Sequence, residues 1–126
     1  MEKRILVLDD DPGILEAIDL SLTYSGFKVR LLLSGDNVVR MIDDFEPDLI
    51  IIDYKLNGRT GGEICLELKS DPGMRNIPVI MLSADSEAAK RNSEFGCDSF
   101  LPKPFDLNVL VKEIQGYIDI QPRIIR

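Results

Sequence analysis

The feature that most constrains this chain is a run of four apolar residues that ends on a carboxylate, Leu49-Ile50-Ile51-Ile52-Asp53. The run does not alternate apolar with polar residues, which is typical of a central strand buried on both faces of a parallel sheet. In open α/β sheets, ligands bind outside the carboxyl ends of the strands. The sequence therefore predicts such a sheet, with Asp53 at its functional edge.

Other apolar runs also end on chemically useful side chains. Asp9 and Asp10 follow Ile5 to Leu8, Ser83 follows Val79 to Leu82, and Lys103 follows Phe100 to Pro102. A further strand, Phe27 to Leu33, is less uniformly apolar and is expected near an edge of the sheet. With helical patterns between them, these runs predict a doubly wound α/β domain of five strands and five helices.

Helix starts are predicted from residues that favour capping positions. Asp11 before Pro12 fits an N-cap followed by the first helical residue, and Thr60 with Glu63 fits a capping box. Ser34 and Asp106 are expected to cap the second and the last helix. The segment from Asp85 to Phe95 is the weakest helix, because it has no Leu, Ile or Val.

Composition narrows the chemistry. The chain of 126 residues has no histidine, which excludes a Ser-His-Asp triad and a His-ligated zinc within it. A net charge of −7 argues against direct nucleic-acid binding, and no apolar run is long enough for a membrane span. Cys65 and Cys97 resemble neither a disulfide framework nor a ligand pair, so a reduced, cytoplasmic setting is expected.

Three carboxylates, Asp9, Asp10 and Asp53, are expected to meet where the first and third strands lie side by side. Like charges this close repel, so the cluster favours a bound cation or a raised pKa. An all-oxygen site with open positions suits Mg²⁺ bridging to a phosphate. Lys103 would supply a positive charge and Ser83 a hydroxyl donor at the same edge. Individually, Asp9 or Asp10 also fits a helix cap, Ser83 a local hydrogen bond, and Lys103 a surface charge.

From about Lys3 to Ile118 the chain resembles a response regulator receiver domain of two-component signalling, similar to chemotaxis regulators. The motifs that carry the resemblance are Ile5 to Pro12, Leu49 to Asp53, Gly61, Ser83-Ala84 and Lys103-Pro104-Phe105. The resemblance implies a flavodoxin-like sheet of order 2-1-3-4-5 and a cis Lys103–Pro104 bond. The expected domain is 3–119, with 120–126 as a C-terminal tail or the start of a linker.

The resemblance also implies the roles of the site residues. Asp53 would be the phosphoacceptor, assisted by Lys103 and Ser83, with Ser83 and Phe100 acting as switch residues. Asp10, Asp53 and the backbone carbonyl of Lys55 would ligate Mg²⁺, and Asp9 would contribute through water. The phosphoryl group would come from a sensor histidine kinase or a phosphotransfer protein, and the surface of helix 4, strand 5 and helix 5 would signal to an unknown downstream protein or effector domain.

Three positions depart from the usual pattern of the family, and all lie in the loop after Asp53. Asn57 stands where proline is usual, Arg59 where an apolar residue is usual, and Thr60 where an acidic or small residue is common. These residues affect the conformation of the loop and remove no chemical group.

Two other functions are weighed against this one. An enzyme resembling the haloacid dehalogenase phosphatases would use the motif Asp9-x-Asp11, but it needs further acidic ligands after Lys103 and gives Asp53 no role. A degenerate receiver that serves only as a docking surface is disfavoured, because every expected group is present. We therefore expect a non-enzymatic signalling module whose own chemistry is self-phosphorylation and self-dephosphorylation.

Overall fold

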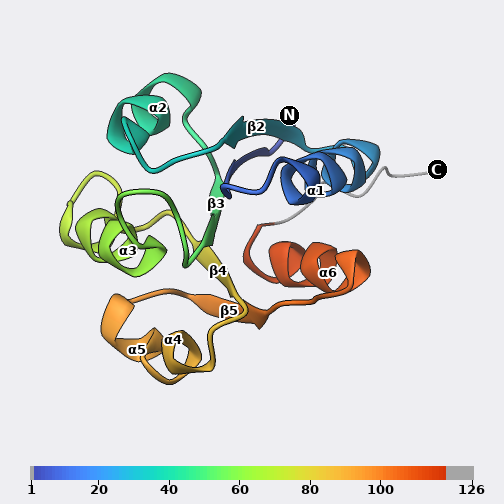
Figure 1. The fold of residues 1–126 in the computed structure, drawn as a ribbon. Helices are drawn as coiled ribbons and strands as arrows, with labels where there is room; N and C mark the ends of the chain where they lie inside the picture. The colour runs from blue at the N-terminus through green and yellow to red at the C-terminus, as the bar shows by residue number, and fades with distance from the viewer. Residues whose placement is uncertain (1, 119–126) are drawn as a thin grey trace.

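Strands and helices alternate along the whole described part of the chain. The computed structural model describes residues 2–118 (Figure 1). Its elements are β1 (Arg4–Leu8), α1 (Pro12–Tyr24), β2 (Lys28–Leu32), α2 (Val38–Phe45), β3 (Leu49–Asp53), α3 (Gly61–Ser70), β4 (Val79–Ser83), α4 (Ser86–Lys90), α5 (Asn92–Phe95), β5 (Ser99–Pro102) and α6 (Leu107–Tyr117). The predicted tail, 120–126, lies outside the described residues.

The strands form one parallel sheet in the order β2-β1-β3-β4-β5, as predicted. Its register places Leu8 beside Ile52, and Ser83 beside Pro102. Because the strands are parallel, their carboxyl ends lie at one edge, and the residues that follow them converge there. β2 lies at one edge of the sheet and is only partly buried, as its mixture of apolar and polar residues predicted.

Helices cover both faces of the sheet (Figure 1). On one face α1 and α6 contribute Ile18, Leu22 and Leu110 to a buried apolar cluster. On the other face, α2, α3 and α5 contribute to a second cluster that includes Ile64 and Phe95. This two-sided cover explains why every residue of β3 is buried. In residues 2–118, none of the helices is both long and apolar enough to cross a membrane.

Most of the predicted helix starts are confirmed. The Asp11 side chain accepts hydrogen bonds from the backbone N–H groups of Gly13 and Ile14, and Thr60 accepts one from Glu63. Asp106 likewise caps α6, through the N–H of Asn108.

The predicted cap at Ser34 is wrong. α2 begins only at Val38, after Asn37, whose backbone adopts the left-handed conformation at φ 60°. Ser34 instead accepts a hydrogen bond from the N–H of Asp36, within the loop that leads to the helix. A serine that satisfies a turn two residues ahead is not available to start a helix.

The segment from Asp85 to Phe95, predicted as the weakest helix, is interrupted. Arg91 separates α4 from α5, so neither piece exceeds five residues. Ala88 and Phe95 are the apolar residues that this segment buries in the core. A helix with so few apolar contacts has little to hold it in one continuous piece.

Two consecutive glycines at the start of α3 allow close packing on both sides. A Cβ atom on Gly61 would lie 2.3 Å from the carbonyl oxygen of Asp53, and one on Gly62 would lie 2.7 Å from the ring of Phe95. The N–H of Gly61 also donates to the carbonyl oxygen of Tyr54. The first turn of α3 therefore touches both the end of β3 and α5.

Candidate functional site

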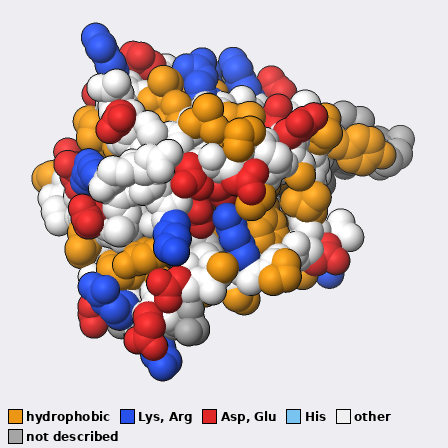
Figure 2. Space-filling view, viewed as in Figure 1, with side chains coloured by type: hydrophobic (Ala, Val, Ile, Leu, Met, Phe, Trp, Pro, Cys, Tyr) orange, Lys and Arg blue, Asp and Glu red, His pale blue; other side chains and the backbone are white. Residues whose placement is uncertain are grey.

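Two strands deliver the predicted carboxylates to one place. Asp9 follows β1 directly and Asp53 is the last residue of β3. Together with Asp10 they form a group, here called the acidic cluster, whose carboxylate oxygens can lie within 4.8 Å of one another. Figure 2 shows acidic side chains gathered in the middle of this face of the molecule, with basic side chains beside them.

Burial differs within the acidic cluster. Asp9 is fully buried and Asp53 is 5% exposed, whereas Asp10 is exposed to solvent. One oxygen of Asp9, Oδ1, accepts a hydrogen bond from the backbone N–H of Asp11. That bond fixes the Asp9 carboxylate and turns its other oxygen toward the site.

The predicted basic partner lies in contact with both buried carboxylates. Lys103 Nζ is 2.9 Å from Asp9 Oδ2 and 3.3 Å from Asp53 Oδ1. Its backbone N–H donates to the carbonyl oxygen of Ser83, which fixes the loop after β5 against the end of β4. The peptide bond between Lys103 and Pro104 is cis, as the resemblance implied.

The charges of the site perturb one another. Burial, and after it the negative charge of Asp9, raise the pKa of Asp53 to about 6, although the charge and the hydrogen bond of Lys103 act to lower it. For Lys103, burial acts to lower the pKa, but the hydrogen bond to Asp9 and the charge of Asp53 outweigh it, so its pKa is raised. A single lysine therefore does not neutralise the acidic cluster.

The donor set fits a hard divalent cation. Three carboxylates within reach of one another offer only oxygen ligands, and one of them faces solvent. Mg²⁺ prefers such oxygen sites and retains several of its waters there. A cation would relieve the repulsion that helps to raise the Asp53 pKa.

Ser83 and Phe100 occupy the neighbouring strands β4 and β5, and only Ser83 lies beside the acidic cluster. The Ser83 side chain is buried, and its Oγ accepts a hydrogen bond from the backbone N–H of Asp85, just before α4. Phe100 is half-buried in β5 and packs against the apolar cluster that contains Phe95. The two predicted switch residues therefore lie on either side of the interrupted segment.

The acidic cluster, Ser83 and Lys103 line one pocket, of about 410 Å³. It is lined by Asp9, Asp10, Asp11, Ile14, Asp53, Lys55, Ser83, Ala84, Asp85 and Lys103. Every predicted site residue except Phe100 is among them. Ile14 was not among the predicted site residues, because an apolar residue in an amphipathic helix gives no signal that it faces a pocket.

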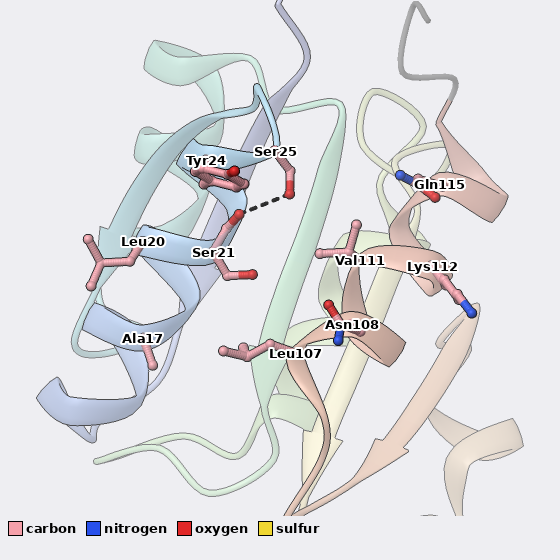
Figure 3. Close-up of a pocket in the computed structure, with 10 residues that line it drawn as sticks. All are labelled: Ala17, Leu20, Ser21, Tyr24, Ser25, Leu107, Asn108, Val111, Lys112 and Gln115. Carbon is pink, nitrogen blue, oxygen red and sulfur yellow. Dashed lines mark hydrogen bonds between the residues drawn. The ribbon is translucent and has the colours of Figure 1, made fainter.

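A larger groove, of about 1010 Å³, lies elsewhere, between α1 and α6 (Figure 3). It is lined on one side by residues such as Leu20 and Tyr24 and on the other by residues such as Val111 and Lys112. At the C-terminal end of α1, the Ser25 hydroxyl donates to the carbonyl oxygen of Ser21. Among the described residues that line it, Lys112 is the one charged residue, so this part of the chain supplies no cluster of charges like that of the smaller pocket.

The site and the fold together define a class of protein: a doubly wound domain with a cation-ready acidic pocket and a lysine at the carboxyl edge of its sheet. The model of the response regulator receiver domain family matches residues 5–115. The chain therefore belongs to the response regulator receiver domains.

Relatives agree with this assignment. The chain is 32% identical over 118 residues to the DNA-binding response regulator MtrA of Mycolicibacterium smegmatis, covering 92% of this chain and 50% of that protein. It therefore spans about half the length of this curated relative. Among solved structures, a response regulator from Chloroflexus aurantiacus is 29% identical with a TM-score of 0.88, covering 93% of this chain and 98% of that one.

A third relative was solved with a ligand. The response regulator TrrA of Thermotoga maritima, in complex with Mg²⁺ and BeF, is 26% identical with a TM-score of 0.83, over 92% of this chain and 99% of that one.

The phosphatase alternative lacks support in the geometry. It requires Asp9 and Asp11 as catalytic groups, and although both line the pocket, the Asp11 side chain is engaged in capping α1. Asp9 is fully buried and paired with Lys103. Asp53, for which that alternative had no role, also lines the pocket.

Proposed function

We propose that this domain accepts a phosphoryl group on Asp53 from the phosphohistidine of a sensor histidine kinase or phosphotransfer protein. The observation that carries the proposal is the position of the Asp53 carboxylate, at the end of β3, within reach of Asp9 and Asp10 and 3.3 Å from Lys103 Nζ. A chain without histidine needs its phosphohistidine from a partner.

The transfer exchanges one bond for another. An oxygen of Asp53 attacks phosphorus, the bond from phosphorus to the histidine nitrogen breaks, and the imidazole leaves with its electron pair. The nucleophile must be the carboxylate, so a neighbouring cation favours the reaction by lowering the raised Asp53 pKa. Asp10, Asp53 and the backbone carbonyl of Lys55 would hold Mg²⁺, and Asp9 would assist through water. The ion would neutralise charge on the transferring group.

Lys103 and Ser83 would then hold the phosphoryl oxygens. Lys103 is in contact with Asp53, so its ammonium group can move from carboxylate to phosphoryl oxygen with little displacement. Ser83 Oγ accepts a hydrogen bond from the Asp85 N–H and so has its own proton free to donate. No substrate is turned over beyond the domain's own phosphorylation and dephosphorylation, so the domain would act as a switch and not as an enzyme.

The switch would operate on the surface of α4, α5, β5 and α6. Drawing Ser83 toward a phosphoryl group changes its contact with the residues that start α4, and Phe100 can follow into the space released. The interrupted segment offers little packing resistance, since it buries few apolar residues. The downstream partner, whether a separate protein or an effector domain, would read this surface in the cytoplasm. The receiver domain would span 3–119, with 120–126 as tail or linker.

The acceptor is tested by intact mass after incubation with acetyl phosphate and Mg²⁺. Wild type should gain one phosphoryl group, and Asp53→Asn none, whereas Asp43→Asn, on the exposed face of α2, should behave as wild type. Chelation of Mg²⁺ should prevent the gain. An equal gain in wild type and Asp53→Asn would refute the assignment.

The switching surface is tested by amide hydrogen exchange with and without beryllofluoride. We expect altered exchange from Asp85 to Phe100 as well as around Asp53, because both are joined through Ser83. Changes limited to the loops around Asp53 would place the output surface elsewhere.

A further inference from the structure

Two cysteines from separate segments of the chain lie in contact, although they form no disulfide. Cys65 is on α3 and Cys97 lies between α5 and β5, and their Sγ atoms are 3.1 Å apart. A disulfide has an S–S length of about 2.05 Å, so the two sulfurs need approach by only about 1 Å to bond. Both are free thiols in the structure.

The surroundings already hold the two cysteines in register. Lys69, one helical turn after Cys65, places its Nζ 2.8 Å from Asp98 Oδ2, and Asp98 is the neighbour of Cys97. The same carboxylate oxygen accepts from the backbone N–H of Val79, and the Asp98 carbonyl accepts from Tyr117. Contacts from α3, β4 and α6 therefore fix the position of Cys97, whether or not the sulfurs are bonded.

The pair combines a reachable sulfur with a reactive one. Cys97 is half-buried, whereas Cys65 is fully buried. The hydrogen bond from Cys97 lowers the pKa of Cys65, and the ammonium of Lys69 acts in the same direction; giving that bond raises the pKa of Cys97. Because the proton lies between sulfurs in contact, the charge can pass from one to the other.

We propose that Cys65 and Cys97 are a site of reversible modification, at which a peroxide converts the two thiols into an intramolecular disulfide. The Cys97 thiol passes its proton to the Cys65 thiolate across the 3.1 Å contact, and the resulting Cys97 thiolate attacks one oxygen of the peroxide, breaks the O–O bond and becomes a sulfenic acid. The released hydroxide takes the proton from Cys65 and leaves as water. The Cys65 thiolate then attacks the Cys97 sulfur and expels the second hydroxide. For hydrogen peroxide the balance is two thiols and one peroxide to one disulfide and two waters, and a dithiol reverses it.

The disulfide would tie α3 to the segment that carries the output. Cys97 is two residues after Phe95, whose ring packs against Gly62 on α3, and three residues before Phe100. Cys97 and Phe100 pack against the same apolar cluster. A covalent link here restricts movement of α5 and β5 relative to α3. This consequence rests on the proposed function, whereas formation of the disulfide does not.

Formation of the disulfide is tested on the whole chain with hydrogen peroxide. Wild type should lose both titratable thiols together and two hydrogens in mass, and a dithiol should restore both. Peptide mapping should show Cys65 joined to Cys97. Thiol loss at separate rates, with oxygen added to each cysteine and no joined peptide, would overturn the proposal.

Single variants separate the roles of the two sulfurs. Cys65→Ser should leave a Cys97 sulfenic acid that a dimedone probe traps, because its resolving thiol is gone. Cys97→Ser should leave a buried Cys65 that reacts roughly tenfold or more slowly than the wild-type pair, since oxidation follows exposure of the thiolate. Equal rates for wild type and Cys97→Ser would contradict the assignment of Cys97, the more accessible sulfur, as the one that reacts first with the peroxide.

The consequence for switching is measured separately, by amide exchange on reduced and oxidised protein with beryllofluoride. The oxidised form should show a smaller response from Asp85 to Phe100 than the reduced form. Identical responses would refute the restriction while leaving the disulfide in place. A reduced form that does not respond anywhere would instead refute the proposed phosphorylation function.

Discussion

The bodies of the central strands and their last residues stand in direct contrast. Along β1, β3 and β4 the apolar side chains of Ile5–Leu8, Leu49–Ile52 and Val79–Leu82 are no more than 1% exposed. Among the side chains whose burial the structure describes, the buried polar or charged ones are Asp9, Asp53 and Ser83, one at the end of each of these strands. On each of these strands, the last apolar residue of the core is followed directly by a polar residue of the candidate site.

The two regions carry opposite free-energy contributions. Burial of a large aliphatic side chain stabilises a fold by about 1.5–3 kcal/mol. Burial of a carboxylate near another carboxylate is unfavourable unless a cation or a hydrogen-bond donor compensates for it. The strand bodies thus supply the stability that lets the strand ends retain a strained arrangement of charge. The predictions below test this division, from the largest effect to the smallest.

The largest effect is expected in a strand body. Ile51 is fully buried in β3, so Ile51→Ala should lower the free energy of unfolding by about 2–5 kcal/mol, through lost burial and the cavity that results. Urea denaturation measures the change. Leu33→Ala, at a side chain that is 54% exposed, should change stability by less than about 0.5 kcal/mol. Similar values for the two variants would break the comparison.

An intermediate effect is expected at Lys103, the cation of the strand ends. Lys103→Ala removes the ion pairs to Asp9 and Asp53 and should destabilise the metal-free protein by about 1–3 kcal/mol, because two charged groups lose a partner. Added Mg²⁺ should recover part of that loss. Lys112→Ala, at an exposed position on α6, is the control and should be neutral. If Lys103→Ala left the free energy of unfolding unchanged, Lys103 would be no more than a surface charge.

The smallest effect has the opposite sign. In the metal-free protein the Asp53 pKa is raised to about 6 from 3.8, so the folded state binds this proton more tightly than the unfolded state does. The associated stability is present below pH 3.8 and is lost as the pH rises through 6. Asp53→Asn should therefore raise the free energy of unfolding by about 1–2 kcal/mol at pH 7.5 in a chelator, after allowance for solvent screening.

The pH dependence supplies the control for this variant. The advantage of Asp53→Asn should shrink at pH 5, where the Asp53 carboxyl of wild type is mostly protonated in the folded state. Urea denaturation at the two pH values gives the comparison. An advantage that is absent at pH 7.5, or that grows toward pH 5, would mean that the buried carboxylate does not oppose folding.

Sequence reasoning succeeded where local pattern determines structure. The run before Asp53 predicted a central strand, and Asp11 and Thr60 predicted helix starts, because each depends on neighbours a few residues away. The order of the strands and the cis Lys103–Pro104 bond were predicted through the family resemblance. The convergence of the acidic cluster, Ser83 and Lys103 followed from the parallel arrangement of the sheet.

Sequence reasoning failed where contacts between residues distant in sequence determine the local structure. Serine is a residue type that favours N-cap positions, but the Ser34 hydroxyl accepts a hydrogen bond from Asp36 in a turn that precedes the helix. The interruption at Arg91 depends on how few core contacts the segment makes, and the contact of Cys65 with Cys97 joins residues that are 32 positions apart.

The paired glycines of α3 limit which sequences this architecture tolerates. Gly61 and Gly62 face different neighbours, the Asp53 carbonyl and the Phe95 ring, and neither position has room for a methyl group. A protein engineer who wishes to retune the output without touching the acidic cluster would therefore begin at Gly62 and Phe95 as a matched pair. Replacing Phe95 by a smaller side chain would make room for alanine at Gly62. Gly61, in contrast, faces the backbone of Asp53, which no side-chain substitution removes.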